Sequence, residues 1–302
     1  MDTIYLIIDE SGAKGYSDKP ESYAGEVGVM AGYLIPEAYF DDVRNKFESL
    51  KEGYFSEGKV HIAELKPEDQ SRIREDIYGF LIEKNIVCVF EAIHSQGFYE
   101  NYERLERLIE NNKSSQRSSV TVPKRKSKEL LHEHLFQGVF GKAVAFCIDN
   151  FGYEFELKVI TDKVDESIKK CFLKAADELI NVGEEKKTIV SGFDTSTREV
   201  VKGSLVSKID NVKDVLDDYS KIKYSISYED TGLTLAADVI VNGLNYHFKS
   251  RSSIEVGINL NDQAAVINHP LEQNIYGLWD SSASNYFADA VFMHPKTNKV
   301  RS

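Results

Sequence analysis

The sequence predicts an α/β fold, because apolar segments typical of buried strands alternate along the chain with segments of helical periodicity. Strands are expected at residues 3–9, 26–35, 85–94, 155–162 and 222–230. Helices are expected at residues 36–51, from 67 onward, and at 99–111, 129–150, 166–182 and 232–248. The short segment 60–65 is ambiguous. Together these elements predict a sheet with helices packed against it.

The 302 residues are enough for a sizeable core, in one large domain or two small ones. With 42% hydrophobic and 28% charged residues, the composition is that of an ordinary globular protein. The three cysteines are scattered, which argues against a disulfide framework or structural zinc and favours a reducing cytosol. No signal peptide and no apolar run that could cross a bilayer are evident. We therefore expect a cytoplasmic protein with no membrane partner.

Charge is distributed unevenly along the chain. The formal net charge is −12, which argues against a protein that coats nucleic acid non-specifically. Residues 113–128 nevertheless contain six basic residues and no acidic one, and they predict a mobile basic loop. Two interpretations remain open for this loop. It is either a solvated linker or a segment that binds nucleic acid through Lys124, Arg125 and Lys126.

Three aspartates occupy positions where an acid needs a partner. Asp9 and Asp162 each close an apolar strand segment, and Asp238 interrupts an apolar helical segment. An aspartate at a strand end is often only a turn or helix-capping residue. The strand ends of an α/β sheet, however, face the crevice where ligands bind. The shared pattern therefore predicts that the three carboxylates converge in one cleft.

The helix around Asp238 carries a polar stripe on an otherwise apolar surface. At steps of three or four residues, the stripe comprises Thr234, Asp238, Asn242 and Asn245. Convergent carboxylates repel, so one of them would be protonated at neutral pH unless a cation lay between them. Carboxylate oxygens suit Mg²⁺ or Mn²⁺, and two such ions can activate water and stabilise the leaving oxygen in phosphodiester cleavage. We therefore expect a site for two divalent ions.

Four motifs resemble a bacterial and phage family catalogued as Domain of Unknown Function 3800. They are "IIDESG" at the first strand, "VHIAEL" with His61 and Glu64, "VITDKVDES" around Asp162, and "GLTLAADVIVNGL" around Asp238. The resemblance extends from Ile4 to Leu244. The sequence departs from the family pattern at Thr234, where the family usually has glutamine. The basic loop and the tail from Ser253 look like additions.

By this resemblance, the fold would be RNase H-like, with a mixed β-sheet flanked by helices and acids on the first strand, a later strand and a late helix. The implied metal ligands and catalytic residues are Asp9, Asp162 and Asp238. Glu10 would join them as a catalytic residue if the chain turns back after the strand, because strand alternation sends neighbours to opposite faces. The accessory candidates are His61, Glu64 and Asn242, although a lone histidine is more often structural.

The resemblance also suggests a domain organisation. An RNase H-like domain is expected over residues 1–250, with the basic loop 113–128 inserted in it. Residues 251–302 are expected to form a C-terminal extension packed on the same domain. No internal repeat is evident in the sequence.

The expected function is that of an Mg²⁺- or Mn²⁺-dependent nuclease, a hydrolase acting on DNA or RNA. The resemblance suggests phage defence or a toxin-like system as its setting. One alternative is a non-catalytic sensor that binds nucleic acid or a protein partner on an RNase H-like scaffold. Another is an actin-like ATPase, since "DESGAKG" is similar to a first phosphate loop, although the matching second loop is absent. A protein partner or a homo-oligomer is compatible with these functions.

Three further motifs receive structural interpretations. The segment "GVFGKA" at residues 138–143 has the wrong spacing for a phosphate-binding loop. The segment "HEH" at residues 132–134 places its two histidines on different sides of a helix, unlike a zinc motif. Phe98, Tyr99 and Tyr102 could stack on bases, but their helical spacing favours a place in the core.

Overall fold

The computed structural model describes most of the chain. It covers residues 1–12, 25–55, 61–100, 102–104, 107, 129–181, 186–194, 196–207, 219–252, 260 and 263–277. The basic segment 113–128, with Lys124, Arg125 and Lys126, lies outside these residues. The expectations for that segment therefore stay predictions.

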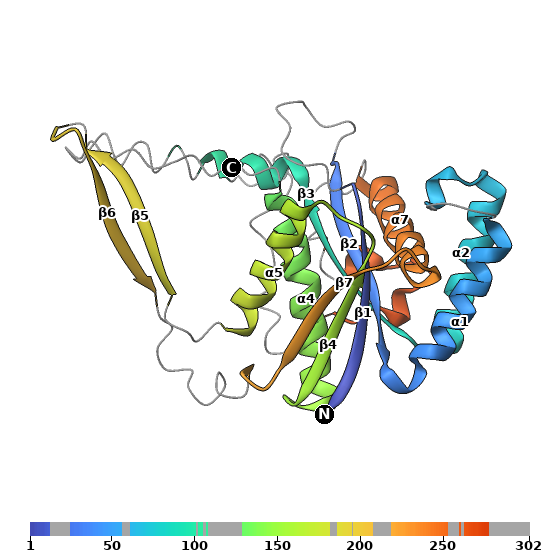
Figure 1. Cartoon of the computed structure of the whole chain (residues 1–302). Helices are drawn as coiled ribbons and strands as arrows, with labels where there is room; N and C mark the ends of the chain where they lie inside the picture. Colours follow the sequence, from blue (N-terminus) through green and yellow to red (C-terminus); the bar gives the residue numbers. More distant parts are fainter. Residues whose placement is uncertain are drawn as a thin grey trace.

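Five strands form one mixed sheet (Figure 1). They are β1 (Asp2–Ser11), β2 (Val27–Pro36), β3 (Val87–His94), β4 (Phe155–Thr161) and β7 (Lys223–Tyr228). Their order in space is β3-β2-β1-β4-β7. Strand β2 runs antiparallel to β1 and β3, whereas β4 runs parallel to β1 and β7. The predicted α/β class with a mixed sheet is confirmed, and all the predicted strands are present.

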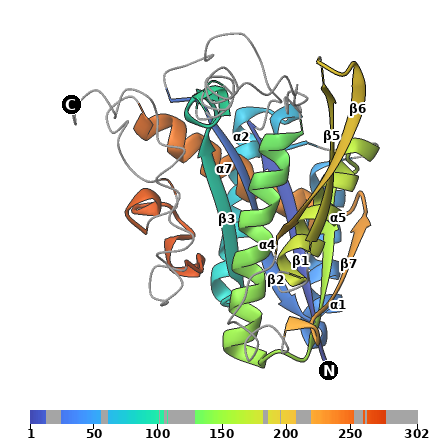
Figure 2. The same ribbon diagram turned by 90° about the vertical axis from the view of Figure 1, so that its left-hand side faces the viewer.

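Helices flank both faces of the sheet (Figures 1 and 2). One face is covered by α1 (Glu37–Tyr54), α2 (Pro67–Glu83) and α7 (Gly232–Ser252). The other is covered by α4 (Leu130–Phe151) and α5 (Glu166–Ile180), with a helical segment at residues 95–100. Among the helices of the described residues, none is both long and apolar enough to cross a membrane.

Strands β1, β2 and β3 are largely apolar on both sides because helices cover each face of the sheet, whereas the edge strand β7 alternates exposed and half-buried residues. On β1, Ile7 belongs to the apolar cluster under α7, whereas Leu6 and Ile8 belong to the cluster under α4. This alternation follows from the pleat of the strand. Strand β2 is buried along its whole length except at Pro36, which explains its nearly continuous apolar sequence.

Strands β5 (Lys186–Asp194) and β6 (Glu199–Ser207) form a separate antiparallel hairpin that extends away from the five-strand sheet (Figure 1). The sequence had led to no expectation for this segment. Arg198, in the turn between the strands, has a φ of 58°. Val200 and Val201 of β6, which are neighbours along the strand, are both exposed.

Residues 263–277 pack beside β3 and α7. They include two short 3₁₀ helices, η2 (Gln263–Val266) and η3 (Glu272–Asn274). The backbone N–H of Tyr276 donates to the carbonyl oxygen of Cys88 on β3 at 2.8 Å. Leu271 and Ile275 join the apolar cluster that contains α7. This part of the C-terminal segment therefore shares its core with the main sheet.

Candidate carboxylate site

Asp9 and Asp162 lie at the same end of two neighbouring parallel strands. The register pairs Ile8 of β1 with Thr161, the last residue of β4. Asp9 and Asp162 therefore occupy the next positions along the two chains. Ile7, two residues before Asp9, belongs to the cluster under α7, so Asp9 faces the same side of the sheet as α7.

Asp238 reaches the same region from α7. This helix packs against β1 and β2, and the side chain of Asp238 in its second turn is 14% exposed. Its Oδ2 accepts a 2.7 Å hydrogen bond from the backbone N–H of Ile62, in the 3₁₀ helix η1 (Ile62–Glu64). Nδ1 of His61 lies 3.7 Å from the same oxygen. The structure therefore places His61, an accessory candidate, beside an acid of the site.

The three aspartates influence one another electrostatically. The pKa of Asp9 is well above its ordinary value of 3.8, first because burial disfavours the ionised carboxylate. Repulsion from Asp238, Glu10 and Asp162 raises the pKa further. The backbone N–H of Glu10 donates a 2.7 Å hydrogen bond to Oδ1 of Asp9, which lowers the pKa. Burial also raises the pKa of Asp238, and Asp162 adds to this rise while the Ile62 N–H and His61 oppose it. The three carboxylates are thus close enough to repel.

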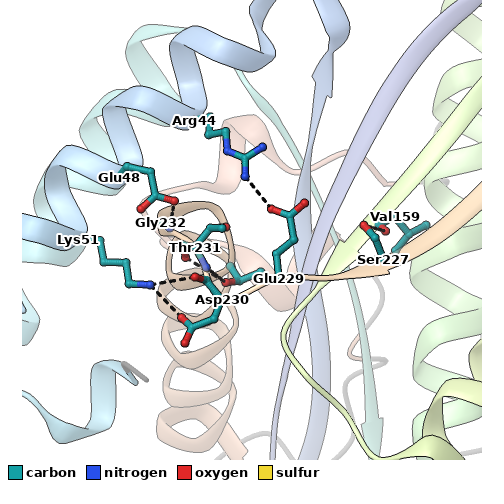
Figure 3. Close-up of polar contacts among 10 residues, drawn as sticks. Arg44, Glu48, Lys51, Val159, Ser227, Glu229, Asp230, Thr231 and Gly232 are labelled. Carbon is teal, nitrogen blue, oxygen red and sulfur yellow. Dashed lines mark hydrogen bonds and ion pairs between the residues drawn. The ribbon is translucent and has the colours of Figure 1, made fainter. Parts of the chain in front are cut away.

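The N-terminus of α7 is held against α1 (Figure 3). The backbone N–H of Gly232 donates to Oε1 of Glu48 at 2.8 Å, which places a negative charge at the positive end of the helix dipole. A Cβ on Gly232 would lie 2.2 Å from the carbonyl carbon of Phe47, so only glycine permits this approach. Two ion pairs flank the contact, Arg44–Glu229 at 3.1 Å and Lys51–Asp230 at 2.9 Å. These contacts fix the helix that carries Asp238.

The turn after β1 is tied to the same helix. Nδ2 of Asn245 donates to the carbonyl oxygens of Ser11 at 3.3 Å and Val27 at 3.0 Å. Gly12 has a φ of 70°, and a Cβ there would lie 2.4 Å from the carbonyl oxygen of Val27. The glycine of "DESG" is therefore required by both its conformation and its surroundings. Through Asn245, α7 holds the end of the strand that carries Asp9.

Glu10 faces the opposite side of the sheet from Asp9. It remains within β1, opposite Met30 of β2, so the chain does not turn back at this residue. Its Oε2 lies 2.5 Å from Nδ1 of His132, a buried residue of α4. Glu10 is therefore not brought onto the face of the three aspartates, although its charge still raises the pKa of Asp9.

His132 is a residue that the sequence interpretation missed. Each residue of "HEH" has its own partner: Glu10 for His132, Lys174 for Glu133 (2.5 Å) and Tyr102 for His134 (2.8 Å). A signal was present in the sequence, because His132 lies three residues before Leu135 on the apolar face of its helix. A polar side chain on such a face requires a partner.

The remaining members of the polar stripe have separate partners. Thr234 caps the first turn of α7, since its Oγ1 accepts from the Thr231 N–H at 3.1 Å and donates to the Thr231 carbonyl at 3.0 Å. Oδ1 of Asn242 accepts a 3.1 Å hydrogen bond from Nη2 of Arg74 on α2. Glu64, the third accessory candidate, is an exposed residue of η1. Asp238 and Asn242 therefore lie together on α7, and Arg74 joins them.

The "GVFGKA" segment has a structural role inside α4. Nζ of Lys142 lies 2.9 Å from Oε2 of Glu91 on β3, and it donates to the carbonyl oxygen of Phe90 at 2.6 Å. Both charged side chains are buried. A Cβ on Gly138 would lie 2.3 Å from Oε2 of Glu91, so this glycine makes room for the ion pair. The segment therefore resembles a phosphate-binding loop in sequence only, because its lysine belongs to a buried ion pair.

The aromatic residues before the basic segment belong to the core. Phe98 is fully buried in the cluster under α4. Tyr99 and Tyr102 are partly buried and pack against the same cluster. The packing of all three agrees with the core interpretation rather than with base stacking.

The chemistry of the three aspartates fits a divalent cation. Their carboxylate oxygens are the donors that Mg²⁺ and Mn²⁺ prefer. Burial first, and then repulsion from the neighbouring carboxylates, raise the pKa of Asp9, and a bound cation would favour its ionised form. Within the described ranges, no group of three or more His, Cys, Asp or Glu side chains is arranged to hold a metal ion. The fit therefore rests on the chemistry of the donors and not on a preformed arrangement of ligands.

Comparison with known proteins assigns no family. No protein-family model matches the chain, and no curated protein is significantly similar to it in sequence. The resemblance to Domain of Unknown Function 3800 therefore stays a prediction. The function has to be argued from the site itself.

Proposed function

We propose that the protein is a nuclease that uses Mg²⁺ or Mn²⁺, in a site for two ions, to hydrolyse phosphodiester bonds of DNA or RNA. The observation that carries this proposal is the meeting of Asp9, Asp162 and Asp238 from β1, the end of β4 and α7, with mutual repulsion between them. The raised pKa values of Asp9 and Asp238 mean that their ionised forms lower the stability of the fold. Such a cost is typical of functional sites.

The site residues have distinct roles in the proposed reaction. Asp9, Asp162 and Asp238 hold the cations, which when bound activate water and stabilise the leaving oxygen. The Ile62 N–H fixes Oδ2 of Asp238 and so sets the orientation of that carboxylate. The ring of His61 turns Nδ1 toward Asp238 and is 41% exposed, which leaves Nε2 to accept a proton from the attacking water.

The arrangement of the fold supports the proposal. A mixed sheet flanked by helices, with acids on the first strand, after a later strand and on a late helix, is the layout that the RNase H-like resemblance implies. On this basis we propose an RNase H-like core acting in the cytoplasm. The setting suggested by the resemblance, phage defence or a toxin-like system, is part of the proposal.

The experiment is a cleavage panel with the full-length chain. Single- and double-stranded DNA and RNA are incubated in Mg²⁺, in Mn²⁺ and in EDTA. The variants are Asp9→Asn and Asp238→Asn, with Asp2→Asn as the matched control. Asp2 is an exposed aspartate at the opposite end of the same strand as Asp9. We expect metal-dependent cleavage that both site variants lose and the control retains.

Other outcomes separate the alternatives. Equal cleavage by the wild type and Asp9→Asn would contradict the proposal. A folded protein that gains thermal stability from metal but cleaves none of the four substrates would favour the non-catalytic sensor. ATP hydrolysis in the same buffers, lost in Asp9→Asn, would favour the actin-like ATPase.

A further inference from the structure

Arg74 of α2 contacts Asn242, which lies one helical turn after Asp238 on α7. Its Nη2 donates to Oδ1 of Asn242 at 3.1 Å. Asn242 follows Asp238 by four residues on α7, so the two side chains are neighbours on one face of the helix. Nε of Arg74 is buried and has no hydrogen-bond partner in the part of the chain that the structure describes. One buried donor of the guanidinium is therefore left unpaired one helical turn from Asp238.

The charge of Arg74 is not neutralised by the groups around it. Among the described residues, Arg74 forms no ion pair with a carboxylate, and the two side chains that hydrogen-bond to it, Asn242 and Tyr78, are neutral. Burial, His247 and Arg74 together lower the pKa of His269 to about 4, so this ring is neutral at pH 7. The pKa of Tyr78 is raised by burial, with Arg74 opposing the rise, so the phenol also stays neutral. A half-buried cation whose contacting side chains are all neutral is suited to bind an anion.

We propose that Arg74 binds a backbone phosphate of the nucleic-acid strand that lies in the carboxylate site. A guanidinium offers phosphate a planar fork of donors, and the hydrogen bond to Asn242 sets the direction of that fork. The inference rests on the proposed nuclease function, and it adds a residue that binds the strand. In a chain of net charge −12, whose site is itself acidic, a fixed cation at the edge of the site would attract and align the substrate.

The test compares Arg74→Gln and Arg74→Lys with a matched control, Arg72→Gln. Arg72 lies two residues away on α2, so it points to another side of the helix, and its side chain is 70% exposed. Each change is made in the full-length Asp9→Asn chain, so that binding is measured without cleavage. The affinity for an oligonucleotide of the cleaved type is measured in Mg²⁺ at several salt concentrations.

We expect Arg74→Gln to weaken binding about tenfold, since one charge-assisted hydrogen bond is lost. We also expect the slope of log K against log salt to become shallower by about 0.7 to 0.9, the value for one phosphate contact. Arg74→Lys keeps the charge and should restore the slope, although not the full affinity, because an ammonium lacks the fork. Arg72→Gln should leave both quantities unchanged.

Three results would overturn the inference. An unchanged slope in Arg74→Gln, with cleavage by the wild type intact, would remove Arg74 from substrate binding and leave the nuclease proposal standing. Equal losses in Arg74→Gln and Arg72→Gln would indicate a general effect of charge. A wild-type chain that neither binds nor cleaves any of the four nucleic acids would refute the nuclease proposal, and the inference with it.

Discussion

The position of Asp9 in the site lowers the free energy of unfolding when its carboxyl is ionised. A carboxyl whose folded pKa lies above its ordinary value of 3.8 binds its proton more tightly in the folded chain than in the unfolded one. The free energy of unfolding therefore falls as the pH rises from about 3.8 through the folded pKa. Once the pH exceeds the folded pKa, the folded chain carries the whole of this loss. Burial and the repulsion from Asp238 are its largest causes.

The substitution Asp9→Asn should therefore raise the melting temperature at pH 7 in EDTA, while it removes cleavage. The gain should shrink as the pH falls and vanish below about pH 3, where the wild-type carboxyl is protonated in both states. Thermal unfolding across this pH range measures the effect. The control Asp2→Asn should show no comparable trend. A less stable Asp9→Asn at pH 7 would mean that Asp9 is a structural residue.

A second prediction concerns the buried ion pair between β3 and α4. In Gly138→Ala, the new Cβ would collide with Oε2 of Glu91 and push it away from Lys142. Separating a buried pair in this way should cost about 3 kcal/mol of the free energy of unfolding. Denaturant titration measures the loss. Gly79→Ala, in α2, is the matched control, because a Cβ there meets nothing within 4 Å.

The control Gly79→Ala should leave the free energy of unfolding unchanged or raise it by up to about 1 kcal/mol, since alanine favours the helix. If the two glycine variants behave alike, the ion pair tolerates displacement and the close approach at Gly138 is not required.

At the scale of elements, the position of α7 decides the geometry of the site. This helix carries Asp238, touches the turn after β1 through Asn245, and meets α1 at Gly232. A methyl group on Gly232 would overlap the backbone of Phe47, so the start of α7 would have to move away from α1. A shift at the start of the helix displaces Asp238, which lies only six residues further on.

We therefore expect Gly232→Ala to lower both the stability and the cleavage rate. Gly53→Ala, near the end of α1, serves as the control, since a Cβ there has nothing within 4 Å. Unfolding and cleavage are measured on the same preparations. Full cleavage by a folded Gly232→Ala chain would show that the site does not depend on this contact.

Much of the fold was predictable at this scale, because the main strands and helices bury apolar faces with regular periods. The hairpin β5–β6 was not predicted. Val200 and Val201, which are neighbours on opposite faces of β6, are both exposed, so no buried face marks this part of the strand in the sequence. The 3₁₀ helix η1 was ambiguous in the sequence, because three residues are too few to show a period.

The site was predictable in part for a similar reason. Asp9, Asp162 and Asp238 stand out because each ends or interrupts an apolar segment. The direction of Glu10 followed from strand alternation once the strand was known to continue through Ser11. The contacts of Glu10 with His132 and of Asn242 with Arg74 join residues more than 100 positions apart. No local pattern in a single sequence encodes such pairs.

At the scale of the whole molecule, metal binding should act as a stabilising ligand. A cation that binds the folded chain and relieves the repulsion between the aspartates raises the melting temperature. The gain is about 2.7 kcal/mol at a hundredfold excess over Kd. We expect this shift with Mg²⁺ or Mn²⁺ in the wild type and in Asp2→Asn, and its loss in Asp9→Asn and Asp238→Asn. A shift of equal size in all four chains would place the metal elsewhere.

The three aspartates are widely separated along the chain, and this has a consequence for the time at which the protein becomes active. Chains emerge from the ribosome N-terminus first, at roughly 5 to 20 residues per second. A nascent chain that ends within β7 already contains Asp9 and Asp162, but its third carboxylate has not yet been made. In the proposed nuclease, the set of three carboxylates is therefore complete only once α7 has been synthesised and has docked on the sheet.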